Sequence, residues 1–392
     1  MDSLNFPGSP EEDFPLLTLS PVDDARHAWS ALLLGGDAAD PGYLPAMARL
    51  FGQLGLGEAL AALPCILPLA DPEALDDALA AQLPAETIIL LVPLARALDP
   101  AAAAARSRLR NRGFRLMAAG LPTTDLPAEI DAVAGDGSIT PPPRLPGPHL
   151  ATGVDDAGRL AAARSAGYGW FAGDYPLHPP PGKSPKGGSS RALLLRLLAM
   201  VAADAPSRDI EALLKQDPAL SYHLLKLVNS VSFALTTPIT SFGYAITLLG
   251  RRQLQRWLQL LIYAQQGKDT GALMARAAYR AGLMEALCQR VGGSKEDQER
   301  AFMTGMFSLL DALFGASLGQ IIAPLNLAAD VEAALLNRGG WLGGLLDIAG
   351  QSGRTPQPAL AGQLAQVLLT PAAYAQAQVE ACRWAINVSR ES

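Results

Sequence analysis

The sequence predicts an α/β domain followed by an all-α domain, and three observations carry this prediction. Before residue 176, short apolar runs alternate with Ala-rich segments of helical spacing, a pattern typical of a mostly parallel sheet with covering helices. After residue 190 the spacing is helical, with few β-branched runs. A Pro-then-Gly/Ser stretch separates the two parts. We therefore expect an α/β domain over 1–182, a linker over 183–190 and an all-α domain over 191–392.

The first part contains several short apolar runs that are expected to form buried strands, each followed by a candidate helix. The strands are expected at Cys65–Leu69, Thr87–Val92 and Phe114–Met117, and the helices at Pro72–Gln82, Pro100–Arg112 and Asp155–Ala166. A complete eight-unit barrel takes roughly 250 residues. Because the first part is shorter than this, we expect an incomplete barrel.

The second part has helical spacing almost throughout. Helices are expected at 191–203, 209–215, 218–230, 241–248, 251–264, 271–291 and 297–314. Asp217 can cap the third of these, because Pro218 needs no amide hydrogen at the first helical position. Gly305 is expected to allow a close approach between two helices.

Charge is divided unevenly along the chain. The 392 residues carry a net charge of −6, but residues 1–182 hold 22 Asp and Glu against 11 Arg and no Lys. Residues 183–392 hold 15 acidic against 20 basic residues. Opposite charges favour attraction, so an intramolecular contact between an acidic N-terminal and a basic C-terminal domain is expected.

Neither the N-terminus nor the cysteines indicate an exported or membrane protein. Residues 1–12 are acidic and contain no apolar core of a signal peptide, and no apolar run reaches the roughly 18 residues of a spanning helix. The scattered Cys65, Cys288 and Cys382 form no CxxC pair and are expected to be buried thiols. A cytoplasmic protein without membrane contact is predicted.

Three segments of the second part resemble the HDOD domain, a relative of the HD-type metal phosphohydrolases. They are Pro218–Ser230, Ser241–Leu254 and Ala301–Leu313, the last reading AFMTGMFSLLDAL. Their order and spacing match the family over residues 191–380. The resemblance implies an all-α HDOD fold.

This resemblance also implies a test for catalysis, because HD enzymes hold divalent metal with a His, a His-Asp pair and a distal Asp. Aligned on the AFMTGMFSLL segment, the His-Asp pair falls at Ser308 and Leu309, and Arg276 stands nearest to the first His. Asp311 is the remaining acid nearby, and no His follows His223. HDOD domains are the non-catalytic branch of this family, so no metal, cofactor or hydrolysis is expected here.

Three segments of the first part resemble the EAL domain. Phe14–Leu34 is similar to its opening strands, Gly113–Leu121 to the strand that ends in paired Asp, and Leu150–Pro181 to its closing strand, helix and exit strand. An EAL domain before an HDOD domain is a known arrangement. The whole chain therefore resembles the EAL–HDOD two-domain signalling family, with a degenerate EAL-type barrel first.

EAL phosphodiesterases cleave cyclic di-GMP with two metals, held by carboxylates, and a Lys that helps to activate water. Here the motif Glu falls at Ser30, the paired Asp at Ala119 and Gly120, and the later Glu at Thr152. Asp155 is the one acid near a family position, and this part has no Lys. Hard cations need several converging oxygen ligands. We therefore expect no catalytic, cofactor-binding or metal-binding residues.

A candidate interaction surface remains in the second part. It consists of Asn229, Ser230, Arg251, Arg252, Arg256 and Trp257. The first two can be a helix cap or a contact. The Arg and Trp residues can be a solvated helix end, a docking patch for the acidic domain or a partner, or a nucleic-acid site, which a denser positive surface would favour.

Three functions are open on these grounds. The leading interpretation is a non-catalytic adaptor that acts through protein–protein interaction with an unknown signalling protein. A non-catalytic receptor for a nucleotide or nucleic acid is the alternative, and a residual metal-dependent phosphodiesterase the third. Titration with cyclic di-GMP, guanosine nucleotides and RNA separates the first two, and turnover of a phosphoester identifies the third.

Overall fold

The structure is a computed structural model that describes most of both domains. The described residues are 14–137, 140–179, 193, 195–197, 199–200, 205–214, 255–256, 258–260, 263, 271–325, 327–351 and 358–391. The expected helices at 218–230 and 241–248 and the linker at 183–190 lie outside them. The domain limits given above therefore stay a prediction.

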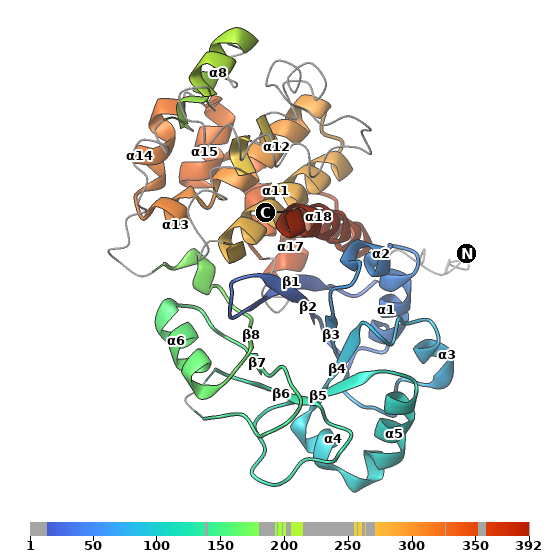
Figure 1. Ribbon diagram of the computed structural model, residues 1–392. Helices are drawn as coiled ribbons and strands as arrows, with labels where there is room; N and C mark the ends of the chain where they lie inside the picture. The colour runs from blue at the N-terminus through green and yellow to red at the C-terminus, as the bar shows by residue number, and fades with distance from the viewer. Residues whose placement is uncertain are drawn as a thin grey trace, which may run out of the picture.

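The N-terminal part is a closed barrel of eight strands in sequence order. The strands are β1 (Thr18–Asp24), β2 (Trp29–Gly35), β3 (Cys65–Pro68), β4 (Ile88–Pro93), β5 (Arg115–Ala119), β6 (Ala132–Gly135), β7 (Leu150–Ala151) and β8 (Trp170–Phe171). β1 is antiparallel to both of its neighbours, β2 and β8, and every other neighbouring pair is parallel. The α/β fold class is thus confirmed (Figure 1).

The expectation of an incomplete barrel is wrong, since the ring of strands closes. It closes within a short chain because β7 and β8 have two residues each. In addition, no described helix lies between β5 and β6 or between β6 and β7. One cluster of buried apolar side chains draws members from all eight strands and therefore fills the barrel interior. It comprises Val22, Ala31, Ile66, Ile89, Met117, Ala132, Ala134, Leu150, Trp170 and Ala172.

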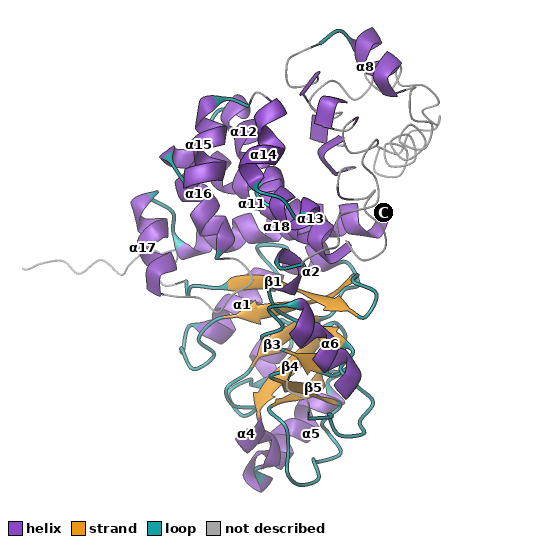
Figure 2. Cartoon of the chain, turned by 90° about the vertical axis from the view of Figure 1, so that its left-hand side faces the viewer, coloured by secondary structure: helices purple, strands orange, loops and turns teal. Residues whose placement is uncertain are grey.

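Short helices cover the outside of the barrel (Figures 1 and 2). They are α1 (Tyr43–Phe51), α2 (Leu56–Leu60), α3 (Asp77–Ala80), α4 (Leu94–Leu98), η1 (Pro100–Ala102), α5 (Ala103–Asn111), α6 (Ala157–Ala166) and η2 (Tyr175–Leu177). The helix expected at 72–82 is reduced to α3. It starts late because the Asp76 carboxylate accepts a hydrogen bond from Leu79 N and so caps the helix there.

The C-terminal part is helical, as predicted. Its described elements are α8 (Ser207–Leu214), α11 (Gly271–Arg290), α12 (Lys295–Phe307), α13 (Leu310–Phe314), α14 (Leu318–Ile322), η4 (Ala323–Leu325), α15 (Ala329–Asn337), α16 (Gly340–Gly350), α17 (Pro358–Gln366) and α18 (Pro371–Glu391). α11 is buried nearly all round, which is typical of a central helix, and it packs against α12 and α18.

Two residues, Gly305 and Ser308, explain how closely α12 packs and where it ends. A Cβ on Gly305 would lie 2.7 Å from Ala281 Cα, so the predicted close approach of two helices, here α11 and α12, is confirmed. The single helix expected at 297–314 is divided at Ser308 and Leu309 into α12 and α13. At this break the Ser308 hydroxyl donates a hydrogen bond to Gly305 O, a side-chain bond that competes with the regular helix pattern.

The two parts pack against each other along β1 (Figure 2). Gln378 of α18 donates a hydrogen bond from Nε2 to Leu17 O and accepts one at Oε1 from Leu19 N, both 2.9 Å long. Its side-chain amide thereby satisfies the strand backbone as a neighbouring strand would. The Tyr279 hydroxyl of α11 lies 3.3 Å from the same Oε1.

Candidate functional site

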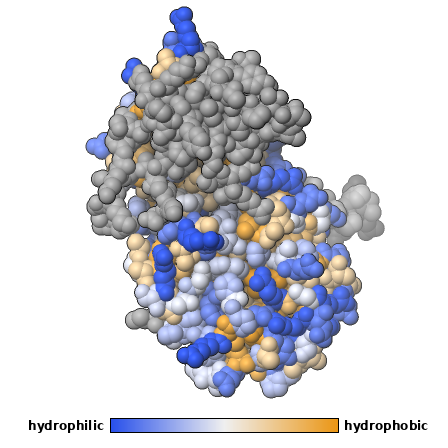
Figure 3. Space-filling view, viewed as in Figure 1, coloured by the Kyte–Doolittle hydropathy of each residue, from blue (hydrophilic) through white to orange (hydrophobic). Residues whose placement is uncertain are grey.

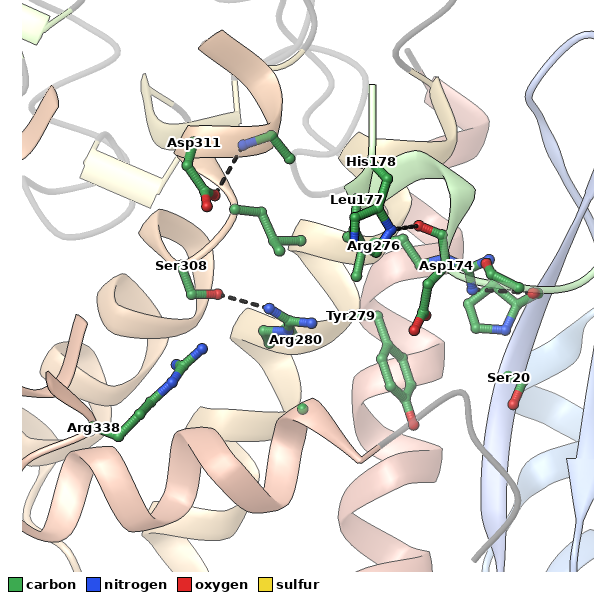
Figure 4. Close-up of a pocket in the computed structure, with 15 residues that line it drawn as sticks. Ser20, Asp174, Leu177, His178, Arg276, Tyr279, Arg280, Ser308, Asp311 and Arg338 are labelled. Carbon is green, nitrogen blue, oxygen red and sulfur yellow. Dashed lines mark hydrogen bonds between the residues drawn. The ribbon is translucent and has the colours of Figure 1, made fainter. Parts of the chain in front are cut away.

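A polar cavity lies between the barrel and the helical domain. Its volume is about 310 Å³, a size at the lower end of small-molecule pockets. The barrel contributes β1 and the segment that follows β8, and the helical domain contributes α11, the α12–α13 junction, Arg338 and the end of α16 (Figure 4). The charged or polar side chains that line it are Ser20, Asp174, His178, Arg276, Tyr279, Arg280, Ser308, Asp311 and Arg338.

Arg276 joins the two domains at the edge of this cavity. Its guanidinium donates hydrogen bonds to Pro21 O at 3.0 Å, to Asp23 Oδ2 at 3.1 Å and to Gly173 O at 3.3 Å. The Asp23 side chain is fully buried and also accepts a hydrogen bond from the Tyr175 hydroxyl at 3.2 Å. Burial raises the pKa of Asp23, while the positive charge of Arg276 opposes that rise.

Arg280 lies one turn further along α11 and points into the cavity (Figure 4). Its guanidinium donates one hydrogen bond, to the Ser308 hydroxyl at 3.2 Å. Burial, with repulsion from Arg338 as the next cause, lowers the pKa of Arg280 to about 10. Arg280 therefore stays charged at neutral pH, as a cation with little solvent around it.

His178 closes the barrel side of the cavity. Its Nδ1 lies 3.0 Å from Asp155 O and 3.2 Å from Asp174 O. Both neighbours are carbonyl oxygens, which can only accept, so Nδ1 carries a hydrogen. The ring is thereby held in one orientation beside Asp174 (Figure 4).

The residues aligned with the HD metal ligands meet in this cavity, although they come from two separate helical segments. Arg276, Ser308, Leu309 and Asp311 all line it. Arg280 and Arg338 also line it and were missed by sequence reasoning. The signal for Arg280 was available: it follows Arg276 by four residues and so shares one helix face with it. Arg338 is brought in from α15, which no local pattern indicates.

The residues aligned with the EAL metal ligands lie at the barrel rather than in the cavity. Ser30 donates a hydrogen bond to Ala28 O, and Thr152 donates one to Gly135 O. Ala119 ends β5 and Gly120 follows it. Asp155 accepts a hydrogen bond from Asp174 N at 3.3 Å. Within the described part of the chain, no three His, Cys, Asp or Glu side chains are close enough together to hold a metal ion.

The predicted interaction surface can be placed at one residue. Asn229, Ser230, Arg251, Arg252 and Trp257 lie outside the described residues. The Arg256 guanidinium forms a 2.5 Å ion pair with Glu285 of α11 and lies 4.4 Å above the centre of the Phe302 ring. These contacts tie Arg256 to its own domain. The surface as a whole stays a prediction.

In the part of the chain that the structure describes, no single helix is both long and apolar enough to span a membrane. One pair of segments, Lys295–Phe314 with Leu318–Leu325, passes the length and composition test but bends by 114°. The barrel face seen in Figure 3 mixes hydrophilic and hydrophobic side chains.

The fold and the cavity define a two-domain protein, a closed α/β barrel joined to a helical domain. The family model of the HDOD domain matches residues 191–320. Cyclic di-GMP phosphodiesterase CdgJ of Vibrio cholerae is 34% identical over 208 residues, which cover 51% of this chain and 46% of CdgJ. The uncharacterized protein YuxH of Bacillus subtilis is 31% identical over 127 residues, or 31% of each chain. The matches thus span less than half of either relative.

Two solved structures have a weak overall likeness to this chain. The EAL domain of Mycobacterium smegmatis DcpA has a TM-score of 0.33 and 14% identity over 40% of this chain and 88% of that one. Klebsiella pneumoniae BlrP1 in a calcium/cyclic di-GMP complex has a TM-score of 0.33 and 14% identity over 42% of this chain and 56% of that one. The barrel followed by an HDOD domain, together with the likeness to CdgJ, supports the resemblance to the EAL–HDOD two-domain family.

The prediction of a non-enzymatic adaptor is wrong on this comparison. CdgJ, a relative of 34% identity, is a cyclic di-GMP phosphodiesterase, so the relatives of this chain include an enzyme. The prediction relied on the absence of the EAL ligands from positions that were aligned through short strands. Such an alignment does not establish that an activity is lost, because other side chains can reach a site from neighbouring loops.

Proposed function

We propose that the chain acts in cyclic di-GMP signalling as a phosphodiesterase. The observation that supports this proposal is the 34% identity to cyclic di-GMP phosphodiesterase CdgJ. The closed barrel is compatible with it, because the loops after parallel barrel strands gather at one end and carry the active site in barrel enzymes.

The described residues at that end do not fit the pair of metal ions that EAL phosphodiesterases use. Acidic side chains do follow the strands: Asp71 lies after β3 and Asp136 after β6, and Asp99 lies at the end of α4, the helix after β4. However, Asp71 and Asp99 are both bound to Arg96, at 2.7 Å and 2.5 Å. Since no group of three ligands converges in the described part of the chain, we derive no step through a metal.

The side chain of this chain that we expect to act on a phosphodiester is Asp155, the acid nearest to a position aligned with an EAL metal ligand. It precedes Asp156, the N-cap of α6, and lies beside the segment that follows β8. A carboxylate at that place can accept a proton or orient water. This role is inferred from the position of Asp155, and turnover of cyclic di-GMP tests it.

The test is turnover of cyclic di-GMP by the full chain with Mg²⁺ or Mn²⁺, followed by chromatography of the products. Accumulation of the linear dinucleotide above a protein-free control is expected, and Asp155→Asn is expected to lower the rate at least tenfold. Asp125→Asn, in an exposed loop after β5, is the matched control and should leave the rate unchanged. Absence of product with either metal would refute the proposal.

We further propose that opposite charges help to hold the two domains together and that the chain passes its output to a partner signalling protein. The buried Asp23–Arg276 pair at 3.1 Å and the exposed Glu58–Arg383 pair at 3.8 Å support the first part, because each joins an N-terminal acid to a C-terminal base. The exposed pair contributes little. The buried pair is tested by the Arg276 variant described in the Discussion.

A further inference from the structure

Two cations share the cavity between the domains. Arg280 and Arg338 both line it, and their side chains converge from α11 and from the end of α15 (Figure 4). Their mutual repulsion is one cause of the lowered pKa of Arg280. Holding the buried Arg280 cation beside a second positive charge is unfavourable unless an anion offsets it.

Arg280 has hydrogen-bonding capacity to spare. A guanidinium has five N–H donors, and one of them is used, by the Ser308 hydroxyl. Among the described residues, no carboxylate lies within ion-pair distance of Arg280. By contrast, Arg276 in the same helix is neutralised by Asp23. The charge of Arg280 therefore faces the cavity, with the negative charges of Asp174 and Asp311 acting on it from beyond ion-pair distance.

Arg338 occupies a position that normally favours glycine. It lies at the C-terminal end of α15 with φ of 54°, in the left-handed region. Its Nε lies 3.6 Å from Asp347 Oδ1. An arginine at such a position carries a backbone cost, and costs of this kind are commonly retained at functional sites.

The acids at the cavity leave room for an anion. Asp174 lies on the barrel side near His178 (Figure 4). Asp311 accepts a hydrogen bond from Ala312 N at 2.9 Å. Neither forms an ion pair with Arg280 or Arg338 in the described structure. With Arg276 already paired to Asp23, the two arginines that remain in the lining are Arg280 and Arg338.

We propose that this cavity is a binding site for the phosphate monoester group of a nucleotide-sized small molecule, held between Arg280 and Arg338. Guanidinium groups pair bidentately with phosphate oxygens, and a phosphate monoester has three free oxygens with which to engage two guanidinium groups at once. The volume of about 310 Å³ admits a nucleoside monophosphate but not a folded protein segment.

A ligand here would contact both domains. Ser20 and His178 come from the barrel, whereas Arg280, Ser308 and Arg338 come from the helical domain. Binding would therefore stabilise the docked arrangement by mass action, whether or not the barrel turns over a substrate. The proposal is independent of the phosphodiesterase activity and can fail separately from it.

Isothermal titration calorimetry on the full chain tests the site, with guanosine monophosphate as the probe and guanosine as its uncharged control. The monophosphate should bind with a saturable isotherm that weakens as salt is raised, and guanosine should bind at least tenfold more weakly. Inorganic phosphate should compete with the monophosphate. Absence of binding, or equal binding of guanosine, would overturn the proposal.

Two variants locate the binding. Arg280→Gln should weaken the monophosphate roughly tenfold to a hundredfold, the loss expected for a charge-assisted hydrogen bond. Arg338→Gln, at a half-exposed side chain, should weaken it as well and serves if Arg280→Gln does not fold. Arg208→Gln, an exposed arginine of α8, is the matched control and should bind as the parent does. Unchanged binding by both cavity variants would place the ligand elsewhere and refute the site.

Discussion

Replacing Arg276 with methionine should destabilise the folded protein by about 4 kcal/mol, because it leaves Asp23 as a buried carboxylate without a cation. Breaking a buried ion pair by removal of one partner typically costs about 3–5 kcal/mol. The Tyr175 hydroxyl still donates to Asp23, which favours the lower part of that range. The carbonyls of Pro21 and Gly173 also lose a donor, at roughly 1 kcal/mol each, which favours the upper part.

The cost should depend on pH in a defined direction. Burial raises the pKa of Asp23 in the folded state, and loss of Arg276 raises it further. Between the unfolded and folded pKa values the folded state binds more protons, so stability falls as pH rises. We therefore expect the variant to lose more stability at pH 8 than at pH 5, relative to the parent protein.

Urea denaturation followed by tryptophan fluorescence and by circular dichroism measures these effects. The double variant Asp23→Asn with Arg276→Met removes both charges and should regain most of the lost stability, since the buried charge is gone. A cost below about 1 kcal/mol for Arg276→Met would contradict the reasoning. So would a double variant no more stable than the single one.

Three other predictions concern packing and thiols. Gly305→Ala should lower stability by about 1–3 kcal/mol in a thermal melt, because the new Cβ would lie 2.8 Å from Arg280 O; Gly344→Ala, with open space around it, should be neutral or stabilising. Gln378→Ala should cost about 2 kcal/mol in urea, since it removes the partner of two backbone groups, Leu17 O before β1 and Leu19 N within it; an unchanged midpoint would contradict this. Because burial raises their pKa values, the thiols should resist a thiol reagent until the chain is unfolded; they are Cys65, Cys288 and Cys382.

Local patterns in the sequence predicted much of the fold, because strands and helices with their own apolar spacing are visible in isolation. β3, β4 and β5 fall within a few residues of the expected runs, and the expected helix at 271–291 is α11. Barrel closure was missed because it depends on pairs such as β7 with β8, whose two-residue strands carry no periodicity.

The candidate site was predictable only in part. The alignment to HD ligands picked out Arg276, Ser308 and Asp311, and these do meet in one cavity. It could not supply Asp23 or Arg338, because contacts between distant segments are decided by how the domains pack. The functional prediction failed for a related reason: residues missing from aligned positions show what those positions lack, not what the folded site contains.

The bridge made by Gln378 has a consequence for synthesis on the ribosome. N-terminal domains commonly fold first while the rest of the chain is still being made. Here Leu19 of β1 bonds to a side chain 359 residues later, and Asp23 to one 253 residues later. β1 can pair with β2 and β8 inside the barrel, but its contacts to the helical domain form only after α11 and α18 have emerged. The last contacts made during synthesis of this chain should therefore be those of its first strand.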